Sequence, residues 1–451
     1  LGAIGETADR EGIEAYAVGG AIRDALLKRE TTDLDFVTVG SGSGIALAEA
    51  VADRLDAGMA HVYENFGTAA VRLSQEEGDP LVLEFVAARK ESYRADSRKP
   101  IVENGSLEDD QRRRDFTVNV LAIALNEGRF GRLVDPFDGI ADFRRRRLRT
   151  PLDPEETFED DPLRMLRAAR FAAQLGFTIE RETYRAMSEK AYRIEIVSQE
   201  RITEELQKIV DASLPSQGLR ILYRTGLLKE IFPELDALAG VEVRGGRAHK
   251  DNFFHTLQVV DNVATRTAHR PIEEVRWLRW AALLHDIAKP ETKRFSPEEG
   301  WTFHGHEDKG ARMVKPIFRR LKLPLDERMR YVRTLVELHH RPVALVDEHV
   351  TDSAVRRLLF EAGDAIDDLM LLVRADITSK NPRRVYRYLE HFDRVEEKMR
   401  IVEEKDRIRN FEPPVDGNEI METLDLEPGP AIGEIKDAIK DAILEGTIPN
   451  D

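Results

Sequence analysis

Residues 15–39 read AYAVGGAIRDALLKRETTDLDFVTV, and this stretch decides the fold of the N-terminal part of the chain. The apolar runs at 16–18 and 33–39 are typical of two short strands. Between them, Gly19 and Gly20 form a turn signal before a helical pattern. A strand, a glycine turn, a helix and a second strand together predict a head domain that combines a sheet with helices.

The two aspartates of the DLDF run are the first candidate site. Side chains alternate along a strand, so Asp33 and Asp35 point to one face while Leu34 and Phe36 point into the core. Two convergent carboxylates repel each other unless divalent cations neutralise them, and such oxygen ligands suit Mg²⁺ carried in with a triphosphate. We therefore expect a magnesium site here, although an Asp-x-Asp pair alone is also typical of a solvated strand end.

Gly19 and Gly20 precede a helix that we expect to begin near Ala21. Glycines allow a ligand to approach the backbone closely, and the free N–H groups at a helix N-terminus can hold phosphate oxygens. The simpler interpretation of the glycine pair is a plain tight turn.

Taken together, GGAIRD at 19–24 and TTDLDF at 31–36 resemble the opening motif of the DNA polymerase beta superfamily, in its tRNA nucleotidyltransferase and poly(A) polymerase branch. The resemblance implies that Gly19, Gly20 and Arg23 bind the nucleotide. It also implies a catalytic role for the two aspartates of TTDLDF, which hold magnesium in that superfamily.

Later segments extend the resemblance. RRRDFTVNV at 112–120 is similar to the ribose-recognition motif of that branch, which implies that Arg114, Asp115 and Asn119 lie beside the sugar and phosphates. Its alternative is a turn capped by Asp115. Glu84 in LVLEFVAAR is the candidate for the third catalytic carboxylate, or else an outward-facing strand residue. DPFDGIADF at 135–143 resembles the hinge that follows, and FGT resembles a strand near the nucleotide.

The segment FEDDPLRMLRAARF, residues 158–171, resembles the family motif in which an acid, and an arginine three residues later, face the incoming base. The family more usually has Glu-Asp where this chain has Asp-Asp, so the base-reading pair becomes Asp161 and Arg164, with Arg167 one turn further. At about 100° per residue these three side chains share one arc of a helix. A carboxylate and an arginine can accept both cytosine and adenine by their amino donors and ring acceptors.

Asp161 also has a structural interpretation, because Asp before Pro162 is an ordinary helix start. That interpretation does not cover Arg164 and Arg167, since cations in the first turns oppose the helix dipole.

Further along, histidines and aspartates recur in the segments NFFHTLQVVDN, AALLHDIAKP, FHGHEDKGA, LVELHHRP and LVRADITSK. Their order resembles the HD phosphohydrolase superfamily, which implies a site for Mn, Ni, Fe, Zn or Mg. A lone histidine of this kind is usually a satisfied core or surface residue, and the region can also serve as a structural body for RNA. The implied ligands are His255, His285, Asp286, His306, His339 and Asp376.

Bulk composition excludes several classes. The chain has 451 residues, 41% of them hydrophobic and 34% charged, and no apolar run approaches the length of a membrane span. No cysteine is present, which excludes disulfides and suits a cytoplasmic protein. No signal peptide is visible. A net charge of -16 argues against a generally basic RNA-coating surface, so any RNA site must be local.

We expect an α+β protein in which an N-terminal sheet-and-helix head precedes an all-helical remainder. The predicted limits are a nucleotidyltransferase head at 1–145, a helical neck with the base-selecting motif at 146–215, a helical body with the HD domain at 216–395, and a helical, tRNA-contacting tail at 396–451. The polar segment at 91–105 resembles the mobile loop with which this family switches from C to A addition.

The resemblance implies template-independent addition of C, C and A to the 3′ end of tRNA from CTP and ATP, with release of pyrophosphate. A poly(A) polymerase shares the same head motifs and is the main alternative. A protein that acts mainly as an HD phosphohydrolase is the alternative from another class, and the intact aspartate motif counts against it. A non-catalytic RNA scaffold would leave Asp33 and Asp35 unexplained.

Overall fold

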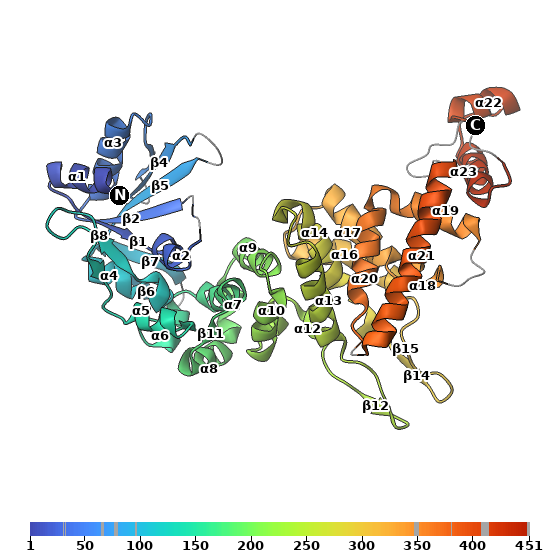
Figure 1. The fold of residues 1–451 in the computed structure, drawn as a ribbon, viewed down its shortest axis with the longest axis horizontal. Helices are drawn as coiled ribbons and strands as arrows, with labels where there is room; N and C mark the ends of the chain where they lie inside the picture. The colour runs from blue at the N-terminus through green and yellow to red at the C-terminus, as the bar shows by residue number, and fades with distance from the viewer. Residues whose placement is uncertain are drawn as a thin grey trace. The chain divides into compact units, whose positions relative to one another are not determined.

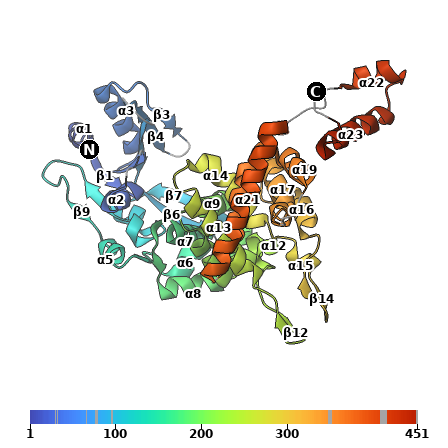
Figure 2. The same cartoon turned by 45° about the vertical axis from the view of Figure 1, so that its right-hand side comes forward.

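The computed structural model describes residues 1–29, 31, 33–64, 67–75, 80–94, 97–346, 351–379, 381–406 and 415–448 (Figures 1 and 2). The chain divides into two compact units. The first comprises Leu1–Ile202 with Ile221–Glu230, and the second comprises Thr203–Arg220 with Ile231–Asp451. The four domain limits expected from the sequence stay a prediction. The boundary between the two units after Ile202 falls inside the neck expected at 146–215. None of the helices in the described ranges is both long and apolar enough to cross a membrane.

A mixed sheet forms the core of the first unit. In the described residues it has seven strands in the order β3-β4-β5-β2-β1-β8-β9. β2 and β5 are parallel, and every other neighbouring pair is antiparallel. The strands are β1 (Glu14–Val18), β2 (Asp33–Val39), β3 (His61–Tyr63), β4 (Thr68–Leu73), β5 (Leu81–Ala87), β8 (Ala122–Ala124) and β9 (Leu133–Val134).

Helices α1 (Gly2–Arg10) and α3 (Ser43–Leu55) pack on one face of this sheet. Phe36 is fully buried there, stacked on Phe85 with ring centroids 4.9 Å apart, and Leu34 packs against the same cluster. The strand alternation predicted from the sequence is therefore confirmed for β2. Helix α2 (Gly20–Leu26) connects β1 to β2 and begins one residue earlier than expected.

The segment expected to be a polar loop at 91–105 is mostly paired. Strands β6 (Arg89–Arg94) and β7 (Ser97–Asn104) form an antiparallel hairpin, which leads into α4 (Leu107–Arg112) through a capping box on Ser106. Its polar sequence concealed the strands, because a hairpin outside the main sheet does not show an apolar alternation.

The rest of the first unit is helical, with one short parallel pair of strands, β10 (Arg147–Leu148) and β11 (Thr178–Ile179). Helix α7 is apolar on one side and carries three arginines. The helices are α5 (Gly139–Arg144), α6 (Pro154–Asp160), α7 (Leu163–Leu175) and α8 (Arg181–Glu189), followed by a 3-10 helix at Ala191–Ile196. Helices α9 (Gln199–Val210) and α10 (Pro215–Arg224) each cross from one unit to the other, and α11 (Leu227–Ile231) and α12 (Pro233–Asp236) follow.

The second unit is built on five helices whose ends carry histidines and aspartates. These are α13 (Asn252–Arg266), α14 (Ile272–Leu284), α16 (His306–Arg320), α17 (Glu327–Leu338) and α20 (Ile366–Asp376). Shorter or later helices are α15 (Lys289–Thr292), α18 (Arg341–Ala344), α19 (Asp352–Ala362), α21 (Pro382–Asp406), α22 (Gly417–Leu424) and α23 (Pro430–Glu445).

The α+β class is confirmed, but the remainder after the head is not purely helical. Besides β10 and β11, the second unit has two hairpins, β12 (Val243–Arg244) with β13 (Arg247–Ala248), and β14 (Arg294–Ser296) with β15 (Gly300–Thr302). Strands of two or three residues are too short to display an alternating pattern, so the sequence did not reveal them.

Candidate active site and metal centre

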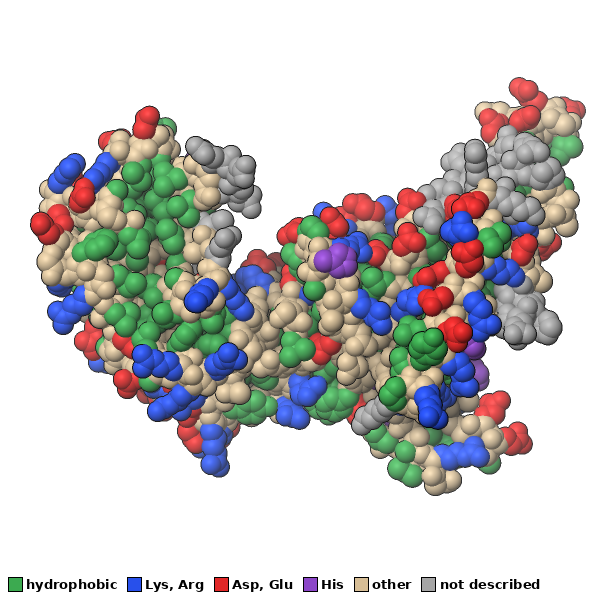
Figure 3. All heavy atoms as spheres, viewed as in Figure 1, with side chains coloured by type: hydrophobic (Ala, Val, Ile, Leu, Met, Phe, Trp, Pro, Cys, Tyr) green, Lys and Arg blue, Asp and Glu red, His purple; other side chains and the backbone are tan. Residues whose placement is uncertain are grey.

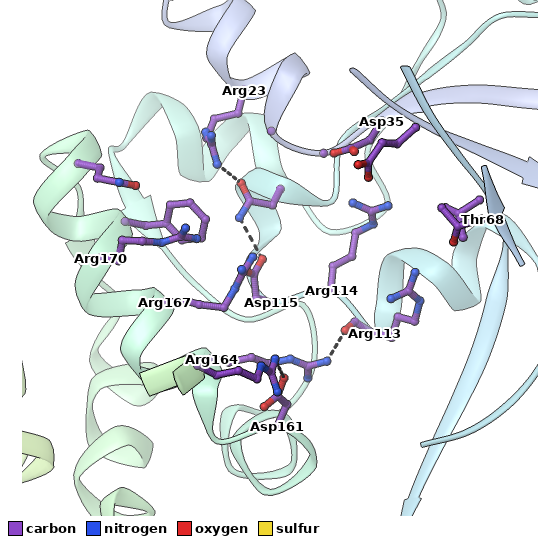
Figure 4. A pocket seen from close by; sticks show the side chains of 18 residues that line it. Arg23, Asp35, Thr68, Arg113, Arg114, Asp115, Asp161, Arg164, Arg167 and Arg170 are labelled. Carbon is purple, nitrogen blue, oxygen red and sulfur yellow. Dashed lines mark hydrogen bonds and ion pairs between the residues drawn. The ribbon is translucent and has the colours of Figure 1, made fainter. Parts of the chain in front are cut away.

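A pocket of about 540 Å³ lies in the first unit and gathers most of the predicted head residues (Figure 4). Its walls come from the β1–α2 turn, from β2, β4 and β5, from the segment after α4, and from α7. The lining residues are Gly19, Gly20, Arg23, Asp35, Thr68, Glu84, Val86, Arg113, Arg114, Asp115, Asn119, Asp161, Arg164, Arg167, Arg170, Phe171, Gln174 and Arg201.

Gly19 is required by its backbone and by its neighbours. Its φ of 77° lies in the left-handed region, and a Cβ added there would come within 3.0 Å of Asp35 Oδ2 and 3.3 Å of Arg114 Nη1. Any side chain would therefore strain the turn and crowd the carboxylate. The glycine lets β1 end directly against Asp35.

Three carboxylates, those of Asp33, Asp35 and Glu84, lie on one face of the sheet. Asp35 stands opposite Glu84 in the parallel register of β2 and β5, and Asp33 is exposed at the start of β2. Burial, followed by the charges of Asp35 and Asp33, raises the pKa of Glu84. Burial and the charge of Asp33 also raise the pKa of Asp35, against the lowering effect of Arg114.

These pKa shifts express burial first and mutual repulsion second, and for Asp35 the charge of Arg114 relieves part of the cost. An all-oxygen donor set with excess negative charge fits a hard divalent cation. The structure thus brings together the residues predicted to hold the head metal, and Glu84 is placed beside the two aspartates rather than on a separate face.

A hydrogen-bonded chain crosses the floor of the pocket. Arg23 Nη1 donates to Asn119 Oδ1 at 2.7 Å, and Asn119 Nδ2 donates to Asp115 Oδ1 at 3.0 Å. Arg167 Nε donates to Asp115 Oδ2 at 2.7 Å, which ties α7 to the head (Figure 4). Asp115 also accepts from the backbone of Phe116, so the predicted turn cap is present in addition.

Asp115 is ionised in this chain. Burial alone would raise its pKa, but the charge of Arg167 and the hydrogen bonds from Asn119, Arg167 and Phe116 lower the pKa to about 2. A buried carboxylate held in this way fixes the positions of its donors.

Asp110 forms ion pairs with two arginines, Arg113 and Arg114, that lie near the three carboxylates. Its side chain is fully buried, pairs with Arg113, and receives Arg114 Nη2 at 2.9 Å. The ion pair with Asp110 keeps the guanidinium group of Arg114 close to Asp35. Asp110 was not predicted from the sequence, although its place three and four residues before two arginines is the spacing of helical ion pairs.

Arg164 is held differently from the expectation. It is 8% exposed, and its Nη1 and Nη2 donate to the backbone oxygens of Thr157 and Arg113, at 3.2 Å and 2.5 Å. Part of its fork is thus used to join α6, α7 and the head. Its position in the pocket leaves other N–H groups for a ligand.

Asp161 lies in extended backbone between α6 and α7, with φ of -139°. Its Oδ1 accepts the backbone N–H of Leu163 at 3.2 Å, which is the helix-start role considered from the sequence. Its Oδ2 lies 3.5 Å from Arg201 Nη2. Asp161 therefore both caps α7 and lines the pocket.

Several lining residues were not predicted. Phe171 carries the guanidinium groups of Arg23, Arg167 and Arg170 on its ring, the last at 4.2 Å from the centroid. Arg170 and Phe171 continue the helical spacing of Arg164 and Arg167, so one further turn of the same motif would have indicated them. Arg201 lies in a separate helix, and nothing in its local sequence points to the pocket. Within FGT, Thr68 lines the pocket, and Phe66 is outside the described residues.

The second unit brings together all six residues of the predicted HD site. His255 Nε2 lies 2.7 Å from Asp376 Oδ1, and His285 Nε2 lies 3.3 Å from Asp286 Oδ2. On the other side of Asp286, the Nε2 atoms of His306 and His339 lie 3.3 Å and 3.8 Å from Oδ1.

The outer nitrogens of these histidines are already used. The Nδ1 atoms of His285, His306 and His339 contact the backbone oxygens of Ala282, Phe303 and Val336, each at 2.7 or 2.8 Å. Such contacts orient imidazoles so that Nε2 faces a metal. Four inner atoms are buried without a hydrogen-bond partner, namely His285 Nε2, Asp286 Oδ1, His306 Nε2 and His339 Nε2, whereas Asp376 Oδ1 faces His255 Nε2.

Unpartnered buried polar atoms are costly, and a cluster of them around the two oxygens of Asp286 fits bound cations. The charges of His285 and Lys289 hold the pKa of Asp286 far below its usual value despite burial, so the carboxylate is available as an anionic ligand. Burial lowers the pKa of His339 and keeps the imidazole neutral, as metal binding requires. His340, which the sequence analysis did not single out, also lies within ligand distance of His306 and His339.

Comparisons with known proteins match three successive regions of the chain. A family profile described as "Poly A polymerase head domain" matches residues 15–149, and "Probable RNA and SrmB- binding site of polymerase A" matches 176–238. "HD domain" matches 252–378. The fold and the matched regions define the class, which is a nucleotidyltransferase with a polymerase-type head and an HD domain.

Similar proteins extend over nearly the whole chain. The "A-adding tRNA nucleotidyltransferase" of Deinococcus radiodurans is 34% identical over 96% of this chain and 92% of its own length. The "CC-adding tRNA nucleotidyltransferase" of Thermus thermophilus is 31% identical over 96% and 91%. The "Multifunctional CCA protein" of Xanthomonas campestris is 36% identical over 81% and 85%.

Among solved structures, the Bacillus stearothermophilus CCA-adding enzyme in complex with CTP matches with a TM-score of 0.65 and 26% identity. The match covers 99% of this chain and 93% of that one. On the strength of these relatives, the chain belongs to the tRNA nucleotidyltransferase family.

Proposed function

We propose that this protein adds C, C and A in turn to the 3′ end of tRNA, using CTP and ATP and releasing pyrophosphate. One observation carries the proposal. A single pocket is lined by Asp35 and Glu84 and also by Asp161 and Arg164, so a nucleotide can place its triphosphate and its base on different groups of the same cavity. The names of the relatives from Deinococcus, Thermus and Xanthomonas support tRNA as the acceptor.

The reaction needs no covalent intermediate. The terminal 3′-hydroxyl oxygen of the RNA attacks the α-phosphorus of the nucleotide, a new phosphodiester bond forms, and the bond to the β-phosphate breaks to release pyrophosphate. The work of the protein is to position the two reactants and to compensate charge.

Each group of residues has a distinct task in this proposal. Asp33, Asp35 and Glu84 would hold Mg²⁺ together with the triphosphate. The backbone of Gly19 and Gly20 and the side chains of Arg23 and Arg114 receive phosphate oxygens, and Asp115 and Asn119 face the ribose. Asp161, Arg164 and Arg167 face the base. When bound, magnesium would supply charge neutralisation at the phosphates, where excess negative charge otherwise slows attack.

The structure adds a reason why base choice is fixed without a template. Arg164 is immobilised by two backbone contacts and Asp161 by one, and Arg167 is held by Asp115. Groups fixed in this way accept an amino donor beside a ring acceptor, the edge that cytosine and adenine share. They leave guanine and uracil with mismatched donors and acceptors.

The test is an incorporation assay. Transcripts of tRNA ending before the first C, after one C and after two C residues are incubated with Mg²⁺ and one labelled nucleotide at a time. We expect C on the first two substrates and a single A on the third. Addition of A alone or C alone would narrow the function to that of the Deinococcus or Thermus relative, and a long A tail would replace it with poly(A) polymerase activity.

We propose a second function for the HD centre, namely hydrolysis of phosphate esters. The four unpartnered inner atoms favour it, since they lie around the two oxygens of Asp286, where divalent cations fit. His255, His285, Asp286 and Asp376 would hold a first divalent ion, and His306 and His339 extend the site. Mixed imidazole and carboxylate ligands suit Mn, Ni, Fe, Zn or Mg, and the bound ion would supply an activated water.

This second proposal is tested by metal analysis and by hydrolysis of p-nitrophenyl phosphate and a nucleoside 2′,3′-cyclic phosphate. Protein dialysed against each of the five metals should retain a stoichiometric amount of at least one of them and hydrolyse an ester. If no metal binds to the native chain, the centre is a structural element only.

A further inference from the structure

The two hairpins of the second unit, β12 with β13 and β14 with β15, border the HD centre. Strand β13 lies against β15, so that the four short strands form one unit, which we call the hairpin pair (residues 241–250 and 293–304). Strands this short are not stable alone, and side-chain contacts must hold them. Figure 3 shows basic, apolar and acidic side chains together on this part of the surface, at lower right.

A row of rings and cations leads from the HD centre into the hairpin pair. Lys289 Nζ is 2.6 Å from Asp286 Oδ2 and 5.6 Å from the ring centroid of Phe303. The ring of Phe303 lies 6.1 Å from that of His249, and the His249 ring lies 5.1 Å from that of Trp301. Consecutive contacts therefore connect a predicted metal ligand to an exposed hairpin.

The row continues outward on the same hairpins. Trp301 and Phe295 have ring centroids 5.1 Å apart, and Arg244 lies over Phe295 at 5.4 Å. Lys293 lies 5.6 Å from the Trp301 centroid. The indole Nε1 of Trp301 donates to the backbone of Arg247, which fixes the ring across the two hairpins. These half-buried rings each carry or adjoin a cation.

Both hairpins also run directly into groups that orient metal ligands. The backbone oxygen of Phe303, just after β15, accepts from His306 Nδ1 at 2.8 Å. Lys250, just after β13, has its Nζ 2.9 Å from His255 Nδ1. The inner end of the hairpin pair is therefore the rim of the HD centre itself.

The local charge favours an anionic ligand at the outer end. The hairpin pair has three acidic residues, of which Glu242 pairs with Lys293, against five basic ones: Arg244, Arg247, Lys250, Lys293 and Arg294. In the part of the chain that the structure describes, Arg244 and Arg294 are exposed and form no ion pair. Glu298 and Glu299, in the β14–β15 turn, are the opposing charges.

We propose that the hairpin pair binds the single-stranded 3′ end of an RNA and leads its terminal phosphate to the HD centre. Aromatic rings offer stacking surfaces to successive bases, and cations beside them receive the backbone phosphates. An acidic protein partner would be bound by the cations alone, and its binding would not require a series of aromatic rings. Delivery to the HD centre rests on the proposed hydrolytic function, whereas binding to the hairpins does not.

The experiment measures binding of a fluorescent single-stranded RNA hexamer with a 3′-phosphate to the full chain, in EDTA, by anisotropy. We expect Trp301→Leu to raise Kd at least fivefold, and Trp301→Phe to restore most of the affinity because it keeps a ring. The double variant R244Q/R294Q should lower the slope of log Kd against log salt by about 1.4, at about 0.7 per lost phosphate contact on a single strand.

The matched control R312Q/K315Q removes two exposed charges from α16 in the same unit and should leave the hexamer affinity unchanged. Circular dichroism of each variant checks that the fold is retained. Equal loss in this control would overturn the proposal, as would wild-type affinity in both Trp301→Leu and R244Q/R294Q. Equally tight binding of a polyglutamate peptide, insensitive to Trp301→Leu, would overturn it in favour of an acidic protein partner.

Metal analysis separates this inference from the function on which its last step rests. A chain that binds no metal but loses hexamer affinity in Trp301→Leu refutes hydrolysis and supports the hairpin surface. A chain that binds metal and hydrolyses esters, with hexamer affinity unchanged in both hairpin variants, refutes the surface alone.

Discussion

The partly buried carboxylate of Asp35 lowers the stability of the fold when it is ionised. Burial and the neighbouring Asp33 raise its pKa, so its ionised form costs stability at neutral pH when no cation compensates. Gly19 is adapted to the same side chain, because no Cβ fits beside its Oδ2. Asp115 is the opposite case, a buried carboxylate that its partners hold ionised.

The first prediction concerns Asp35→Asn. This change should lower the rate of nucleotide addition by about 10³-fold or more. It removes a ligand of the metal that stabilises charge in the transition state, which costs several kcal/mol. It should also raise the thermal unfolding midpoint in EDTA, because the uncompensated charge is gone. Incorporation assays and melting curves check both results. The control D53N alters an exposed aspartate on α3 and should change neither.

A second prediction follows from the pKa of about 2 for Asp115. A folded pKa below the unfolded value of 3.8 stabilises the protein above that value, by about 2 kcal/mol at pH 7, and about half is lost on acidification to pH 3. Asp115→Asn should therefore be less stable than wild type at pH 7, and the gap should narrow toward pH 3. Urea unfolding at several pH values measures it, and a gap independent of pH would contradict the assigned pKa.

At the scale of elements, the junction between α6 and α7 joins stability to specificity. Asp161 caps α7 through Leu163 and at the same time faces the pocket, and Arg164 ties the junction to the head through the backbone of Arg113. Both interpretations of Asp161 from the sequence are structurally present, because its two oxygens point to different partners. Substitutions that keep the capping oxygen but change the charge facing the pocket can distinguish the structural role of Asp161 from its role in base selection.

The third prediction compares two changes at Asp161. Asp161→Ala should destabilise the chain by about 1 kcal/mol through the lost cap and should blur the choice among the four nucleotides. Asp161→Asn keeps a capping oxygen, so it should retain stability but still misincorporate. Unfolding midpoints and single-nucleotide incorporation ratios check this. Normal base choice in both variants would leave Asp161 with a helix-capping role alone.

At the scale of the whole molecule, two compact units hold two separate sets of charged residues. The head pocket lies entirely within the first unit, and the HD residues lie entirely within the second. No residue of one set belongs to the other. We therefore expect the two chemistries to be separable by mutation.

The fourth prediction tests this separation. His285→Asn and Asp286→Asn should abolish metal retention and ester hydrolysis by the second unit while leaving CTP and ATP incorporation within about twofold of wild type, a change in barrier of about 0.4 kcal/mol. Both activities are measured on the same preparation. Joint loss of the two, in a variant that melts normally, would show that the units depend on each other.

The sequence alone determined what short-range patterns can encode. The period-two alternation of DLDF placed Asp33 and Asp35 opposite the core, the glycine pair marked the turn, and the order of His and Asp motifs specified the HD set. These features depend on neighbours within a few residues, so periodicity and motif resemblance suffice.

Only the tertiary structure decided which distant residues meet. It set Glu84 against Asp35 by strand register, joined Arg167 to Asp115, committed part of Arg164 to backbone oxygens, and brought Arg201 and Phe171 to the pocket. It also assembled the hairpin pair from strands of two or three residues. Contacts of this kind arise from packing between elements far apart in the chain, and no local pattern carries that information.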